Sequence, residues 1–262
     1  MNNRLAKLSQ KNFFYPIIYA LFLIISFIPP ITQKPYSPEN TQQVIIELLM
    51  VAIKPFEKFG IIFHAATIIL AGLILIDSTV SKRLLYGFMG MDFIIIALIQ
   101  SFGKTELFGD IIHIGGLIAF VLLGILWIYA AITSDRDPCT CDLQWQHVIL
   151  LPFAILSFWS PYKVEGDVVL PNFNPTLLLT SPDYGLTFCF TTPVFLYLLF
   201  VLFPKVNIPV YRITAFNGLL YALFNIVHWF SPDTRWMGVL HIPILVLSTA
   251  ALLQSSGRKV SP

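Results

Sequence analysis

Long apolar runs separated by short polar segments make up most of this sequence. A run of about 20 apolar residues is long enough to cross the hydrocarbon core of a bilayer as an α-helix. The pattern predicts eight crossings, at about residues 13–30, 59–76, 84–102, 107–132, 145–159, 184–203, 213–230 and 237–254. The apolar run 44–53 is interrupted by Glu47 and is too short to cross, so we expect an interfacial helix there.

The composition indicates a membrane protein. Of the 262 residues 56% are hydrophobic and 11% are charged, whereas a soluble domain carries about 25% charged residues. We therefore predict an all-α fold, in which residues 1–262 form one polytopic integral membrane bundle of four helical hairpins embedded in the lipid bilayer. The net charge of +2 is spread over short loops without a basic tract, so no nucleic-acid partner is indicated.

Basic residues predict the orientation of the chain. If the N-terminus is inside, the inner segments hold ten Lys and Arg residues and the outer segments hold six. This bias predicts a multi-pass protein of the cell membrane with both termini in the cytoplasm. The basic residues Arg4, Lys7 and Lys11 could instead open a signal peptide, but the apolar run after them ends in Pro29-Pro30 without an Ala-x-Ala cleavage pattern, so we expect a membrane helix.

Polar side chains form a stripe along the seventh predicted crossing. Their spacings of three, four, four and three residues place them on one helical face: Thr214, Asn217, Tyr221, Asn225 and His228. His241 follows after a short turn, near the start of the eighth crossing. We expect the two imidazoles to face one rim of the bundle, with the stripe leading toward them.

A weak repeat marks the even-numbered crossings. Each begins with an aromatic residue followed five positions later by a histidine or a cysteine, namely His64, His113, Cys189 and His241. In regular helices these side chains would sit about 7 to 8 Å below the outer surface, at 1.5 Å per residue. His228 reaches the same expected depth from the other direction. The sequence thus predicts an outward-facing pocket lined by these five side chains.

One interpretation of this pocket is a haem or transition-metal site, because imidazole and thiolate groups are good ligands for both. Asp110, three residues before His113 on the expected helix, could orient that ring. In outline, eight helices with a histidine near the outer end of alternate helices are similar to haem A synthases, which implies a membrane redox protein. The chain lacks an acidic-aromatic-x-His-Arg signature and offers Cys189 where a histidine is expected.

Two other interpretations stay open. Ionisable groups within a membrane span usually face a bundle interior or a water-filled cavity. Asp92, with no basic partner in its own helix, and the polar stripe therefore also fit a small-molecule or proton-coupled transporter. Alternatively, the Asn and Thr side chains join helices by hydrogen bonds in a structural or accessory protein without chemistry.

The remaining motifs exclude some functions. The chain has no Gly-rich phosphate loop, Gly-x-Ser-x-Gly elbow or His-Glu-x-x-His motif, so hydrolase chemistry has no support. Cys139 and Cys141 form a single Cys-x-Cys, which is a weak metal signal, and three cysteines are too few for a disulfide framework. The sequence leaves the substrate and the oligomeric state open.

Overall fold

The computed structural model describes residues 4–75, 79–133, 144–166 and 168–256 of the chain. The protein is mostly helical, with 73% helix and 8% strand. Cys139 and Cys141 lie outside the described residues.

Five helical segments in the described ranges are long and apolar enough to cross a membrane: Lys54–Ile74, Val80–Gln100, Ile114–Thr133, Ile208–Trp229 and Arg235–Ser256. Three other apolar helices are shorter, namely α2 (Phe14–Ser26), α7 (Trp145–Trp159) and α9 (Phe188–Leu202). The predicted helical architecture is thus confirmed, with five helices compatible with a membrane protein. The count of eight crossings stays a prediction.

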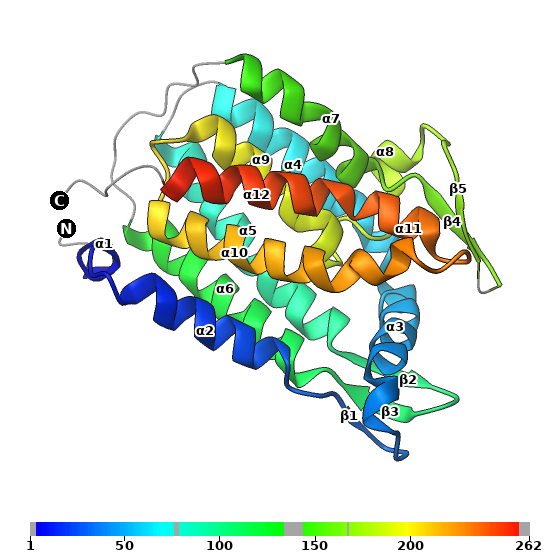
Figure 1. Ribbon diagram of the computed structural model, residues 1–262. Helices are drawn as coiled ribbons and strands as arrows, with labels where there is room; N and C mark the ends of the chain where they lie inside the picture. The colour runs from blue at the N-terminus through cyan, green and yellow to red at the C-terminus, as the bar shows by residue number, and fades with distance from the viewer. Residues whose placement is uncertain (1–3, 76–78, 134–143, 167, 257–262) are drawn as a thin grey trace.

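The long segments are built from η2 (Lys54–Phe59) with α4 (Gly60–Leu75), α5 (Thr79–Gln100), α6 (Ile114–Thr133), α10 (Ile208–Phe224) with η3 (Asn225–Trp229), and α11 (Arg235–Leu240) with α12 (Ile242–Ser256). The shorter elements are α1 (Arg4–Ser9), η1 (Pro38–Asn40), α3 (Thr41–Ala52) and α8 (Leu177–Thr180). Figure 1 shows the apolar helices gathered into one bundle.

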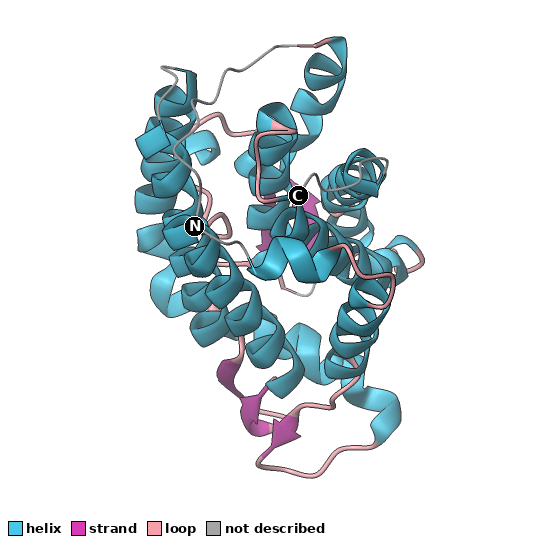
Figure 2. Ribbon diagram, turned by 90° about the vertical axis from the view of Figure 1, so that its left-hand side faces the viewer, coloured by secondary structure: helices cyan, strands magenta, loops and turns pink. Residues whose placement is uncertain are grey.

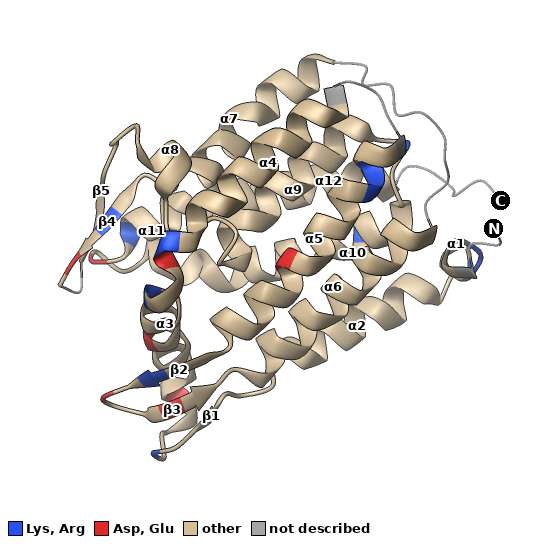
Figure 3. Cartoon of the chain, turned by 180° about the vertical axis from the view of Figure 1, so that it is seen from behind, with Lys and Arg blue, Asp and Glu red and all other residues tan. Residues whose placement is uncertain are grey.

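Helices that follow one another pack as pairs, α5 with α6, α7 with α9 and α10 with α12. Helix α2 packs against α6 and α10 instead, and α4 packs against α5 and α8. Glycine allows the α5–α6 contact, because a Cβ at Gly90 would lie 2.9 Å from the Gly124 oxygen and one at Gly124 would lie 2.8 Å from the Gly90 oxygen. Charged positions are sparse along the middle of the helices (Figure 3).

Short strands occupy the end of the bundle opposite the two termini, called the strand end below (Figure 1). A three-stranded antiparallel sheet has the order β1 (Ile31–Thr32), β3 (Gly109–Ile112), β2 (Phe102–Thr105), and a separate hairpin joins β4 (Tyr162–Glu165) to β5 (Val168–Pro171) (Figure 2). The run predicted as an interfacial helix is α3, which packs on β2 and buries Val44 and Leu48. The sequence pattern did not predict these strands.

The predicted start of the fourth crossing is wrong. Residues 109–112 pair with 102–105 as strands, and α6 begins only at Ile114. Gly109 has φ +68°, a left-handed conformation that ends regular helix and suits glycine. His113 therefore precedes the helix, and Asp110 does not share a helical face with it.

Three other predicted boundaries at the strand end also differ. Gly185 has φ +78°, and α9 begins at Phe188, so residues 184–187 lie in a loop. Helix α10 gives way to the 3-10 turn η3 at Asn225. The last segment breaks at His241, where Pro243 has no N–H to continue the hydrogen-bond ladder. The regular helices on which the expected common depth was based are therefore absent at His113, His228 and His241, whereas His64 and Cys189 lie in α-helices; the common depth stays a prediction.

Candidate functional site

His64 is fixed inside the bundle by both ring nitrogens. Its Nδ1 lies 2.9 Å from the carbonyl oxygen of Gly60, and its Nε2 lies 3.0 Å from the carbonyl oxygen of Phe158 and 3.3 Å from the Ser181 hydroxyl. The ring is fully buried and packs against Phe158 and Tyr184. These contacts join α4 to the end of α7 and to the loop before α9.

His228 and His241 lie together at the strand end. Their ring centroids are 5.8 Å apart and their planes differ by 22°. His241 is buried, and its Nδ1 lies 2.7 Å from the carbonyl oxygen of Met237. His228 is half-buried in η3. The tertiary structure thus brings these two predicted site residues face to face.

The other two predicted ligands, Cys189 and His113, lie in different surroundings. The Cys189 sulfur lies 3.6 Å from the Asn225 amide nitrogen, which also donates to the Tyr221 carbonyl oxygen at 2.8 Å. The ring of His113 packs against Gly116, because a Cβ added there would lie 2.6 Å from its Nδ1. Among the described residues, no three His, Cys, Asp or Glu side chains are grouped so that they could hold a metal ion.

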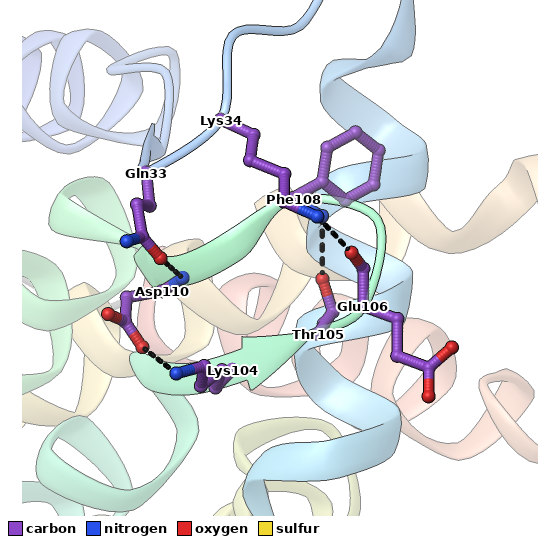
Figure 4. A network of polar contacts seen from close by, with 7 residues as sticks. All are labelled: Gln33, Lys34, Lys104, Thr105, Glu106, Phe108 and Asp110. Atoms are coloured by element: carbon purple, nitrogen blue, oxygen red, sulfur yellow. Dashed lines mark hydrogen bonds and ion pairs between the residues drawn. The ribbon is translucent and has the colours of Figure 1, made fainter.

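Asp110 belongs to the exposed sheet rather than to the histidines. Its carboxylate lies 3.9 Å from Lys104 Nζ, and its N–H donates to Gln33 Oε1 at 3.3 Å (Figure 4). In the same network Lys34 donates to the Glu106 carbonyl oxygen at 2.6 Å. These contacts stabilise the β2–β3 hairpin.

A cavity lined mainly by residues of polar type opens beside His228. Its volume is about 370 Å³, and its lining comes from η1, α3, η3 and the following turn: Glu39, Asn40, Gln42, Gln43, Ile46, Val227, His228, Ser231 and Thr234. Sequence reasoning placed His228 at an outward pocket but missed the wall that residues 39–46 supply. The signal available was the Asn- and Gln-rich stretch just before the interfacial helix.

Some side chains of the polar stripe have hydrogen-bond partners in the described structure and others do not. Thr214 accepts a hydrogen bond from Trp127 Nε1 at 2.9 Å and donates to the Val210 carbonyl oxygen at 2.9 Å. The Tyr221 ring packs against those of Phe120 and Phe188, with centroids 5.1 and 5.0 Å away. Asn217 is fully buried, and neither its amide oxygen nor its amide nitrogen has a hydrogen-bond partner among the described residues.

Asn217 belongs to a set of unpartnered buried polar side chains, called the central polar layer below: Asp92, Thr192, Asn217 and Ser248. Each of these four side chains is at most 1% exposed. Their oxygen and nitrogen atoms have no hydrogen-bond partner in the described part of the chain. A Cβ added at Gly218 would lie 2.3 Å from Ser248 Oγ and 3.5 Å from Thr192 Cγ2. Side chains from α9, α10 and α12 therefore meet at this point.

Aromatic contacts relate the levels of three helices of this layer, α5, α9 and α10. Phe188 packs against Phe93 at 5.8 Å and against Tyr221 at 5.0 Å. Thr192 follows Phe188 by one helical turn, and Asn217 precedes Tyr221 by one turn on the antiparallel helix α10. Asp92 directly precedes Phe93 in α5, so Asp92 lies within about one helical turn of the level of Thr192 and Asn217.

Asp92 is the ionisable residue of the central polar layer. Both carboxylate oxygens lack a hydrogen-bond partner among the described residues, although the side chain is only 1% exposed. Asp92 is therefore a buried carboxyl group with neither a hydrogen-bond partner nor an ion pair in the described structure.

A second buried carboxylate, Asp183, was missed by sequence reasoning. It lies in the loop before α9 and is 3% exposed. Tyr162 donates to its Oδ1 at 2.8 Å, while its Oδ2 has no partner in the described ranges. Burial raises the pKa of Asp183 to about 6; the Tyr162 hydrogen bond opposes this rise, and Glu57 adds to it by repulsion. No sequence motif marks Asp183, because its contact with Tyr162 of the β4–β5 hairpin forms only in the folded structure.

No family model, curated protein or solved structure matches the chain in comparisons with known proteins.

Proposed function

We propose that this protein is a proton-coupled transporter of a small polar molecule, with Asp92 as the group that binds and releases the proton. The observation that carries the proposal is the unpartnered, 1% exposed carboxyl group within an apolar bundle. Burying an ionised carboxylate without a partner is costly. Acids in such positions characteristically belong to ion pathways and proton relays.

The rest of the central polar layer supports binding of a polar solute. Thr192, Asn217 and Ser248 present hydroxyl and amide groups that are unpartnered in the described structure. Each buried polar group left unpaired costs roughly 1–3 kcal/mol. A solute that makes hydrogen bonds with these groups would recover part of that free energy, which a purely structural role does not explain.

The cavity at the strand end is the proposed entrance. His228 lines it, and Asn225, Tyr221 and Asn217 follow inward along η3 and α10. Broken helices near a binding site are common in transporters. The breaks at Asn225 and His241 lie at this entrance, so local rearrangement there would not disturb the packed middle of the bundle.

The proposed topology has eight crossings arranged as four hairpins in the cell membrane, with both termini in the cytoplasm and the strand end outside. The shorter helices α2, α7 and α9 complete the count, because they lie alongside the longer ones in the bundle (Figure 1). The pairs α5–α6, α7–α9 and α10–α12 support three of the hairpins. The bias of basic residues supports the orientation.

A liposome assay tests the function. The purified protein is reconstituted with a pH-sensitive dye inside, and sugars, amino acids, polyamines and nucleosides are added outside in turn. We expect at least one class to start proton uptake above that of protein-free vesicles, and we expect Asp92→Asn to abolish it. Asp110→Asn is the matched control, since that carboxylate is exposed on the β2–β3 sheet. Uptake that survives Asp92→Asn, or no solute response in any class, overturns the proposal.

The structural alternative rests on satisfied polar residues such as His64 and Thr214. It predicts that Asp92→Asn changes stability alone, so the same assay separates the two functions. A metal-ion site built from three or more His, Cys, Asp or Glu side chains is not formed among the described residues.

A further inference from the structure

We infer that Arg212 is the centre of a binding site for an anionic phospholipid. The site lies on the surface between α2 and α10, at the end of the bundle opposite the strand end, which is called the terminal end below. It goes beyond the proposed transport function and does not depend on it. The ligand is defined by its chemistry, with a phosphate for the guanidinium group and an acyl chain for the apolar surface beside it.

Two tyrosine side chains of α2 hold the Arg212 side chain in place. Arg212 is half-buried in the second turn of α10, and its Nε donates a hydrogen bond to the Tyr19 hydroxyl at 3.0 Å. Its guanidinium carbon lies 4.0 Å from the centroid of the Tyr15 ring. The Tyr19 ring in turn stacks on Phe216, with centroids 3.9 Å apart. The guanidinium group is therefore positioned between the two helices before any ligand binds.

The charge of Arg212 has no acidic partner in the described part of the chain. Neither of the two ion pairs among the described residues includes Arg212, and both lie at the strand end. Arginine presents five N–H donors in a planar fork, and the bond to Tyr19 uses the one at Nε. A phosphate can accept two parallel hydrogen bonds from such a fork, and these are stronger than hydrogen bonds between neutral groups. The arrangement therefore suits a phosphate group.

The charge of the surrounding segments also favours an anion. The segments predicted to lie inside hold ten Lys and Arg residues and four Asp residues, whereas those predicted to lie outside hold six Lys and Arg and nine Asp and Glu residues. In the view of Figure 3 the described ribbon at the terminal end carries blue positions and no red ones. Helix α1 packs against α10 and brings the exposed Lys7 to this end (Figure 1). Anionic headgroups are attracted to such basic surfaces.

The surface beside Arg212 suits an acyl chain. Leu223 follows Arg212 by eleven residues, or about three turns, so both lie on one face of the helical segment, and Leu223 is 49% exposed. On α2, Leu23 follows Tyr19 by one turn and is 42% exposed. The strip from Arg212 to Leu223 is about 16 Å long at 1.5 Å per residue. One leaflet of the hydrocarbon core is about 15 Å deep. A cation at the head of an apolar strip of this length favours a phospholipid over a soluble anion.

Native mass spectrometry of the full-length protein in detergent tests the site. Phosphatidylglycerol and phosphatidylcholine with the same acyl chains are titrated in turn at about 0.15 M ionic strength, which screens attraction between distant charges. We expect phosphatidylglycerol to bind more tightly, because phosphatidylcholine carries a cation beside its phosphate. Arg212→Gln should weaken phosphatidylglycerol binding at least about tenfold, since charge-assisted hydrogen bonds are lost. Glycerol 3-phosphate, which has the phosphate but no acyl chain, should not displace the lipid.

Lys11→Gln is the matched control, because it removes the same charge near the same end of α2. Lys11 is exposed, with its Nζ 5.6 Å from the centroid of the Phe13 ring, so its loss should weaken binding less than about threefold. Equal losses in Lys11→Gln and Arg212→Gln would show diffuse attraction and overturn the proposal. Displacement by glycerol 3-phosphate, or equal binding of both lipids, would overturn it too.

A second substitution covers the case in which Arg212→Gln does not fold. Arg212→Lys keeps the positive charge but lacks the planar fork. We expect it to bind phosphatidylglycerol more weakly than the wild type does. Wild-type affinity in Arg212→Lys would mean that charge alone is recognised, and the proposed site would be wrong.

Discussion

Replacing Asp183 by asparagine should change how stability depends on pH. The amide oxygen keeps an acceptor for the Tyr162 hydroxyl, while the buried negative charge is removed. The wild-type carboxyl group has its pKa raised from 3.8 to about 6, mainly by burial. A group whose pKa is raised on folding stabilises the protein below its unfolded pKa, and this contribution is lost as the pH rises through the folded pKa.

The size of the effect follows from that rise. At 1.36 kcal/mol per pKa unit, a change from 3.8 to about 6 corresponds to about 3 kcal/mol. The wild type should therefore lose up to about 3 kcal/mol of unfolding free energy between about pH 4 and pH 6 because of this group. The Asp183→Asn protein should lack this loss, so the variant should be the more stable of the two at pH 7.5.

Thermal unfolding in detergent, followed by tryptophan fluorescence, measures this difference. The melting temperature of the variant minus that of the wild type should increase by several degrees as the pH is raised from 4 to 7.5. Tyr162→Phe is the matched variant, because it removes the hydrogen bond but leaves the carboxyl group. A melting-temperature difference that is independent of pH, or one that falls as the pH rises, would refute the reasoning about burial.

Other expected outcomes concern the bundle, the strand end and the topology. Gly90→Ala should destabilise the protein by about 1–3 kcal/mol in denaturation experiments, because its Cβ would meet α6; Gly87→Ala, with open space around its Cβ, should not. The substitution His228→Ala, at a half-buried position, should leave the melting temperature nearly unchanged but abolish solute-driven proton uptake. The substitution His241→Ala removes a buried ring and should lower the melting temperature as well as abolish uptake. Normal uptake in both variants would contradict the proposed entrance. A reporter fused after Pro262 should be active only in the cytoplasm; activity confined to the external side would contradict the proposed orientation.

The sequence alone determined the mostly helical architecture and its helices apolar enough to cross a membrane. Apolar runs such as 145–159 coincide with a helix, Trp145–Trp159, because in an apolar environment the backbone must satisfy its own hydrogen bonds. The sequence also singled out Asp92 and Asn217, since a polar side chain in an apolar run is conspicuous whatever the packing. Both are buried and unpartnered in the described structure.

Tertiary contacts decided how the polar residues are used. The pattern treated His64 and His241 alike, but His64 lies with a carbonyl oxygen near each ring nitrogen, at 2.9 and 3.0 Å, whereas His241 stacks on His228. Asp110 and Asp183 both precede helices. Asp110 is exposed beside Lys104, whereas Asp183 is buried and accepts a hydrogen bond from Tyr162. Hydrophobic periodicity reports burial along one segment, while hydrogen-bond partners and electrostatic neighbours come from segments that are distant in sequence, so only the folded structure could distinguish these pairs.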